Sequence, residues 1–208
     1  MTLMASKTLI KTSGRTGSHL ILFDYEQMGY TKKYSTDKEL FWEMEYTWAK
    51  GFRYVVQEHK ILGFPKDITD WDLIYNYRED MTSQITSSLI AKATGVWRGT
   101  QNISTKLVFS DEEIKDEVMI HLIHKEVMDK AYKWNWKSRK KISMERLLYL
   151  NNDYSHLDRH KSIAYRDAID NIDEHTVRVI ESIIANEELA KAWGTIKFDM
   201  YEGGKNYV

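Results

Sequence analysis

The hydrophobic and polar positions in the first half of the chain follow two alternating patterns. Short runs of β-branched and apolar residues are typical of buried strands, whereas apolar residues that recur every three or four positions are typical of helices. Strands are expected at 7–13, 52–62 and 71–78. Helices are expected at 18–28, 36–50 and 79–95, the second opening with the capping-type pair Thr36 and Glu39 and the third stopping at Gly95.

The second half of the chain is dominated by one long helical pattern. Ser110 is placed to cap a helix over 111–141, a last strand is expected at 142–150, and a further helix at 172–186. Because strands alternate with helices, we predict an α/β fold with a mainly parallel central sheet flanked by helices. The chain has no repeat and no linker, so residues 1–208 are expected to form a single domain.

Composition then limits the classes of function. The 208 residues are 42% hydrophobic, which is enough for one substantial core. Thirty basic and 31 acidic residues give a formal charge of −1, so no overall field attracts nucleic acid or a membrane, and any anion site must be local. The absence of cysteine excludes disulfides, thiolate catalysis and cysteine-ligated zinc. No signal-peptide or membrane-span pattern is present, and we expect a cytoplasmic protein.

The stretch "TSGRTGS" lies between the first expected strand and the first expected helix. The unsatisfied N–H groups of a tight loop and of a helix N-terminus point at the same place, where an anion fits. Gly14 and Gly17 allow close approach of the backbone, Ser18 can cap the helix, and Arg15 supplies a charged donor fork. The stretch predicts a phosphate or sulfate cradle. An ordinary polar turn with a solvated arginine remains the alternative.

A second anion-binding pattern follows the third expected strand. Arg78 ends that strand, so we expect it at the carboxyl edge of the sheet, the same edge as Arg15. Ser83 and Ser87 are four residues apart and share one face of the next helix, from which either could reach an anion held by Arg78. The alternative is that these side chains only solvate an exposed helix.

Neither segment contains a Walker A motif, because no lysine follows Gly17, and an ATP or GTP hydrolase is therefore disfavoured. The loop instead resembles the 5′-phosphosulfate loop of sulfotransferases that use PAPS (3′-phosphoadenosine 5′-phosphosulfate). The segment after the third strand resembles the bacterial trehalose sulfotransferase type, in the pattern R-x-D-x-x-x-Q-x-x-S followed by T-G-x-W-R. The matching positions are Arg78, Asp80, Gln84, Ser87, Thr94, Gly95, Trp97 and Arg98.

This resemblance implies a P-loop-like sulfotransferase fold and transfer of a sulfuryl group from PAPS to a hydroxyl of a small molecule, such as a carbohydrate, without a metal. The family pattern implies that Arg78 and Ser87 hold the 3′-phosphate, and Ser83, on the same helical face, is a further candidate contact. The implied 5′-phosphosulfate loop consists of Ser13, Gly14, Arg15, Thr16, Gly17, Ser18 and His19. His19 departs from the family pattern, which usually continues with threonine here.

The resemblance also suggests catalytic residues. Arg15 would stabilise charge on the leaving oxygen, and Lys60 would assist it from the second expected strand. Glu39 is the candidate general base, although its place after Thr36 equally suits a capping box; Glu43 and His59 are substitutes. The chain is shorter than typical members of the family, and the late basic glycine-containing loop of that family has no clean match.

Several alternatives stay open. The chain could be an inactive module that binds PAPS or its product, or a phosphotransferase that uses the same loop, and homodimerisation is undecided. Glu117, His121 and His124 share one helical face, a spacing that suits a metal but also arises freely on amphipathic helices. The segment 132–141 interleaves aromatic and basic residues, which suits nucleic acid or sugar rings but is more typical of a basic helix C-terminus.

Overall fold

The structure is a computed structural model in which two compact parts of the chain can be distinguished. It describes residues 6–34, 53–58, 64–65, 67–95, 106–150, 172–186 and 188. The first unit contains Met1–Arg78 and Val127–Leu147, and the second contains Glu79–Glu126 and Leu148–Val208. The expectation of a single domain stays a prediction.

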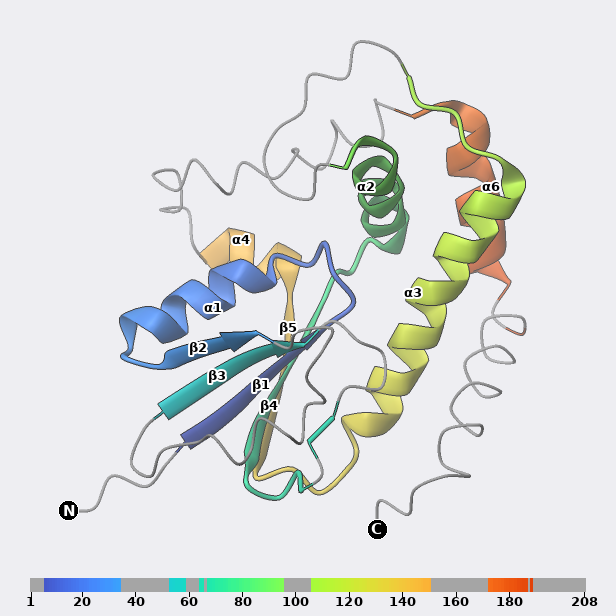
Figure 1. Ribbon diagram of the computed structural model, residues 1–208. Helices are drawn as coiled ribbons and strands as arrows, with labels where there is room; N and C mark the ends of the chain where they lie inside the picture. The colour runs from blue at the N-terminus through green and yellow to red at the C-terminus, as the bar shows by residue number, and fades with distance from the viewer. Residues whose placement is uncertain are drawn as a thin grey trace, which may run out of the picture. The chain divides into compact units, whose positions relative to one another are not determined.

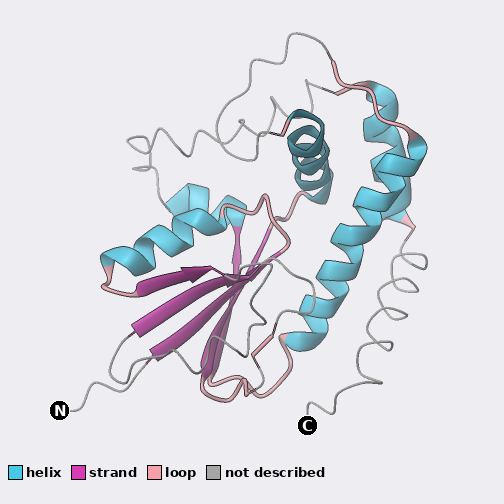
Figure 2. Ribbon diagram, viewed as in Figure 1, coloured by secondary structure: helices cyan, strands magenta, loops and turns pink. Residues whose placement is uncertain are grey.

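The first unit is built on a parallel sheet (Figures 1 and 2). Its five strands lie in the order β2-β3-β1-β4-β5, and every neighbouring pair is parallel. The strands are β1 (Ser6–Thr12), β2 (Thr31–Tyr34), β3 (Arg53–Glu58), β4 (Trp71–Tyr77) and β5 (Ser138–Ser143). The predicted α/β class, with a parallel sheet flanked by helices, is therefore confirmed.

Two helices of the first unit cover one face of this sheet. They are α1 (Ser18–Gln27), which follows β1, and α4 (Met144–Leu150), which follows β5 directly (Figure 1). Ile10 of β1 and Ile74 of β4 pack against Ile21 of α1 and Leu147 of α4. Because successive strand residues point to opposite faces, Lys11 lies on the other side, with its ammonium nitrogen 4.6 Å from the ring centre of Phe64.

The second unit contains three described helices. They are α2 (Met81–Thr94), most of α3 (Asp111–Ala131) and α6 (Glu174–Ala185). Their apolar faces share a core that includes Ile85, Leu89, Ile114, Val118 and Ile180. None of the helices in the described part of the chain is long and apolar enough to cross a membrane.

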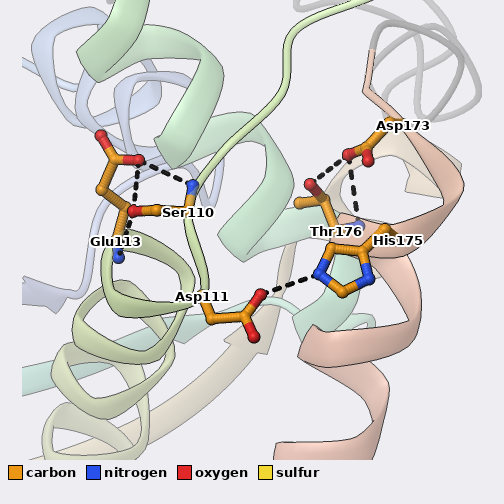
Figure 3. A network of polar contacts seen from close by, with 6 residues as sticks. All are labelled: Ser110, Asp111, Glu113, Asp173, His175 and Thr176. Carbon is orange, nitrogen blue, oxygen red and sulfur yellow. Dashed lines mark hydrogen bonds and ion pairs between the residues drawn. The ribbon is translucent and has the colours of Figure 1, made fainter.

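Side-chain caps define where α3 and α6 begin (Figure 3). Ser110 and Glu113 form a reciprocal capping box, with the backbone N–H of Ser110 donating to the Glu113 carboxylate over 2.8 Å. Asp173 accepts the backbone N–H of Thr176 over 3.2 Å. His175 Nε2 lies 2.8 Å from Asp111 Oδ1, which joins the two helix N-termini at the surface.

Most of the predicted elements are confirmed, with ends that shift by a few residues. The elements confirmed are those expected at 7–13, 18–28, 52–62, 71–78, 79–95 and 172–186. The helix expected at 36–50 lies outside the described residues. The short strand β2 was not predicted.

The segment after Ala131 corrects two predictions. The helix expected over 111–141 ends at Ala131, and the strand expected at 142–150 is instead the end of β5 followed by α4. The Trp136 indole N–H donates to the carbonyl of Ala131 over 2.7 Å, and the Lys137 N–H donates to the carbonyl of Trp71 over 3.1 Å. These bonds turn the chain out of the helix and into the sheet.

The basic residues of this segment are used inside the first unit. The Lys141 ammonium lies 2.7 Å from Asp129, and Lys137 lies 3.8 Å from Asp72. The Arg139 guanidinium donates to the backbone carbonyl of Tyr132 over 3.0 Å. The segment is therefore a charged edge strand, which resists pairing with other chains, and it is not the basic helix C-terminus that was expected.

Glu117 of the second unit is a buried carboxylate that contacts a half-exposed lysine and a buried histidine. One carboxylate oxygen lies 3.2 Å from His121 Nε2, and the other is bonded to the Lys92 ammonium. Burial alone would raise the pKa of Glu117, but hydrogen bonds from His121, Lys92 and Ser88 outweigh it and bring the pKa down to about 2. The spacing that suggested a metal thus serves an ion pair, and the described residues contain no cluster of three metal-ligating side chains.

This ion pair predicts an acid-dependent loss of stability. The pKa of Glu117 is about 2 in the folded protein and about 4.3 when unfolded. The ionised carboxylate therefore contributes fully to the free energy of unfolding above about pH 4.3, and this contribution is lost as the pH falls toward 2. In urea unfolding, Glu117→Gln should cost about 2 kcal/mol at pH 7, and the difference should shrink toward pH 2. Glu112→Gln, an exposed control on the same helix, should cost much less at pH 7. A Glu117→Gln difference equal at pH 7 and pH 2.5 would contradict the assignment.

Candidate anion-binding site

The strand order creates a switch point between β1 and β4. The chain leaves β1 through α1 toward β2, on the β3 side, whereas the chain that leaves β4 leads to β5 on the opposite side. In open parallel sheets, ligands bind beyond the carboxyl ends of strands at such a point. Thr12 is level with Asn76 in the register, so the loop from Ser13 and the residue Arg78 follow the two strands at this edge. The expectation that Arg15 and Arg78 share one sheet edge is confirmed.

The loop between β1 and α1 has an unusual backbone. Gly14, Arg15 and Gly17 all have positive φ, at 85°, 54° and 71°. This conformation is easy for glycine but strained for arginine. Gly17 precedes the first turn of α1, and a Cβ there would lie 3.4 Å from Met144 Cγ of α4. The left-handed turns bring successive N–H groups together beside a helix N-terminus, which is a geometry that binds anions.

A buried chain of hydrogen bonds holds this loop on the sheet. The Gly14 N–H donates to Thr12 Oγ1 over 3.2 Å, and the hydroxyls of Thr12 and Thr16 bond to each other. Thr16 in turn donates to Asn76 Oδ1, and the Asn76 amide donates to the carbonyl of Ile142 over 3.2 Å.

Which hydroxyl donates in each of these hydrogen bonds follows from the number of hydroxyl hydrogens available. Because Thr16 gives its only hydroxyl hydrogen to Asn76, Thr12 must be the donor in the bond between the two threonines. Thr12, Thr16 and Asn76 are each fully buried, so every link replaces a bond to water. The loop is thereby tied to β1, β4 and β5 at once.

Arg15 and Arg78 form the charged part of the site. The pKa of Arg15 is lowered, first by its partial burial and then by the positive charge of Arg78. Arg78 is 8% exposed, and its Nε lies 3.8 Å from Oε1 of Glu145. Two guanidinium groups that repel each other, with one carboxylate nearby, favour an anion that both arginines can contact.

The other predicted donor-loop residues differ in what they can offer a ligand. Ser13, Gly14, Gly17 and His19 are partly exposed, and Ser18 is buried at the start of α1. Thr16 is fully buried and its hydroxyl is committed to the hydrogen bonds with Thr12 and Asn76, so its side chain does not face a ligand. The roles of Thr12 and Asn76 were not predicted. Polar residues at the ends of two otherwise apolar strands were the available signal.

Ser83 and Ser87 belong to the second unit. The Ser83 hydroxyl donates to Asp80 Oδ2 over 3.0 Å and its N–H to Asp80 Oδ1 over 2.8 Å, so this serine completes the N-terminal cap of α2. Ser87 is 5% exposed, and its neighbours Thr86 and Ser88 are also buried. These side chains therefore do not coat a solvent-exposed helix face.

Some candidate residues lie outside the described part of the chain. They are Glu39, Glu43, His59, Lys60, Trp97 and Arg98. Their assigned roles stay predictions.

Comparison of the chain with protein-family models, with curated protein sequences and with solved structures gives no match. The candidate site therefore rests on its own geometry and on the sequence motifs.

The buried hydrogen-bond chain predicts that the Thr16 hydroxyl supports both stability and anion binding. Thr16→Val would remove the acceptor of the Thr12 hydroxyl hydrogen and the hydroxyl that donates to Asn76 Oδ1, which should cost roughly 1–3 kcal/mol in urea unfolding and weaken anion binding severalfold. Thr16→Ser keeps the hydroxyl and should retain most of both. Equal stability of the valine and serine variants would show that these hydrogen bonds do not anchor the loop.

Proposed function

We propose that this protein is a PAPS-dependent sulfotransferase that transfers a sulfuryl group to a hydroxyl of a small molecule, most simply a carbohydrate. The observation that carries the proposal is the pairing of Arg15 and Arg78 beyond the carboxyl ends of β1 and β4. That pairing supports an anionic ligand. The choice of PAPS comes from the resemblance of both arginine-containing segments to sulfotransferase motifs.

The residues present fit such a donor. Its 5′-phosphosulfate is an oxyanion that suits the Arg15 guanidinium and the positive-φ loop beside the N-terminus of α1. Arg78 suits the 3′-phosphate, and the motif adds Ser87 to this contact. Part of the proposal is also that the α/β unit has a P-loop-like sulfotransferase fold, which the parallel sheet and the loop between β1 and α1 support.

The proposed reaction is an in-line displacement at sulfur. The acceptor hydroxyl oxygen forms a bond to sulfur, the bond from sulfur to the bridging oxygen breaks, and adenosine 3′,5′-bisphosphate leaves. Arg15 and the loop N–H groups would stabilise the charge that builds on that bridging oxygen. The hydroxyl proton passes to a base, for which Glu39 remains the candidate, with Lys60 assisting at the leaving group.

Nucleotide selectivity tests the proposal against its alternatives. If the site recognises a 3′-phosphate, adenosine 3′,5′-bisphosphate at roughly 100 times its Kd should raise Tm by about 5–10 °C, and AMP at the same concentration should do much less. Equal stabilisation by ATP would favour a phosphotransferase. Radiolabelled PAPS with a panel of sugars should then give a labelled acceptor. Selective binding without turnover of any acceptor would favour an inactive binding module.

Two substitutions at Arg15 separate its charge from its backbone strain. Arg15→Ala and Arg15→Gly both remove the guanidinium and should weaken binding of adenosine 3′,5′-bisphosphate by roughly 1.5–3 kcal/mol in calorimetry. Only Arg15→Gly also relieves the positive φ, and its free energy of unfolding should exceed that of Arg15→Ala by about 1 kcal/mol. Unchanged nucleotide affinity in both variants would reduce Arg15 to a polar turn residue.

A further inference from the structure

Glu145 occupies a fixed position beside the candidate site. It lies in the first turn of α4, which begins directly after β5. The Arg146 N–H donates to the Ser143 hydroxyl over 3.2 Å, and Leu147 packs in the core against Ile10. Ser143 is level with Tyr77, the residue that precedes Arg78. Sheet register and core packing therefore both hold the Glu145 carboxylate at the end of β4.

The contact between Glu145 and Arg78 is an ion pair rather than a hydrogen bond. The Nε to Oε1 separation of 3.8 Å exceeds hydrogen-bond distances. The Arg78 side chain is only 6% exposed, whereas that of Glu145 is 33% exposed. A partly hydrated carboxylate at this distance neutralises part of the arginine charge, yet it can give way to a better partner.

The charges of Arg15, Arg78 and Glu145 suggest what the ion pair between Arg78 and Glu145 does. Arg15 and Arg78 repel each other, and Glu145 offsets that repulsion at Arg78. An oxyanion that binds Arg78 must either displace the carboxylate or bear its repulsion, because like charges in contact are unfavourable.

We propose that Glu145 is the internal counter-ion of Arg78 and determines which oxyanions this site accepts. A small anion that engages only Arg78 competes with the carboxylate and binds weakly. A ligand that also contacts Arg15 and the loop N–H groups gains enough binding free energy from these contacts to displace the carboxylate from Arg78. This inference deepens the proposed function and rests on it for the identity of the larger ligand, a nucleotide with two oxyanionic groups.

Inorganic sulfate is the probe that tests the role of Glu145 without assuming a nucleotide. Sodium sulfate is titrated against the full chain at ionic strength matched with sodium chloride, and Kd is taken from the shift in Tm. Glu145→Gln should bind sulfate about three- to tenfold more tightly than the unsubstituted protein. Glu145→Asp keeps the charge and should lie between the two.

A matched control separates this local effect from a change in net charge. Glu112→Gln removes one exposed carboxylate from α3, in the second unit, and should leave the sulfate Kd unchanged. In an Arg78→Gln background, with folding checked by circular dichroism, the gain from Glu145→Gln should disappear. Equal sulfate affinity of the unsubstituted protein and Glu145→Gln overturns the proposal, and so does an equal gain in Glu112→Gln.

Titration with adenosine 3′,5′-bisphosphate distinguishes this inference from the proposed function. Tighter sulfate binding in Glu145→Gln, together with no nucleotide binding in any variant, would support the counter-ion role and reject the sulfotransferase assignment. Selective nucleotide binding with identical sulfate affinities would keep the proposed function and overturn the role of Glu145.

Discussion

The buried hydrogen-bond chain from Gly14 through Thr12, Thr16 and Asn76 is the constraint on which the candidate site depends. A loop with positive φ at an arginine is strained, and it keeps that shape only if its surroundings hold it. The buried hydrogen bonds hold the loop in this shape, because breaking one of them would leave a buried polar group unsatisfied. The backbone of the candidate anion site is thus set by the interior of the sheet.

The electrostatics of the site follow from that anchored loop. In the anchored loop, Arg15 lies close enough to Arg78 for the two positive charges to destabilise each other. Glu145 compensates part of this cost at a distance too long for a hydrogen bond. The arrangement stores unfavourable charge that a bound oxyanion would relieve, which is a common way of preparing a site for its ligand.

The sequence predicts an element of the fold well where interactions between neighbouring residues determine it, and poorly where contacts between distant residues do. The strand, loop and helix from Ser6 to Gln27 follow from apolar periodicity and glycine placement, which act over a few residues. The same reasoning failed after Ala131, where helix-favouring residues were drawn into the sheet by Trp136 and by the backbone of Lys137. Here, the packing of Trp136 and the pairing of β5 with β4 stabilise a strand more than local helix propensity stabilises a helix.

By itself, the sequence determined the α/β class, the loop around Arg15 and the position of Arg78 at the end of a strand, because each of these depends on neighbours in the chain. Only the tertiary structure decided that Thr16 points inward to Asn76, sixty residues away, and that Glu145 stands beside Arg78. The physical reason is register. Which residues of β1, β4 and β5 lie level with one another depends on the packing of whole strands and helices, and no short stretch of sequence contains that information.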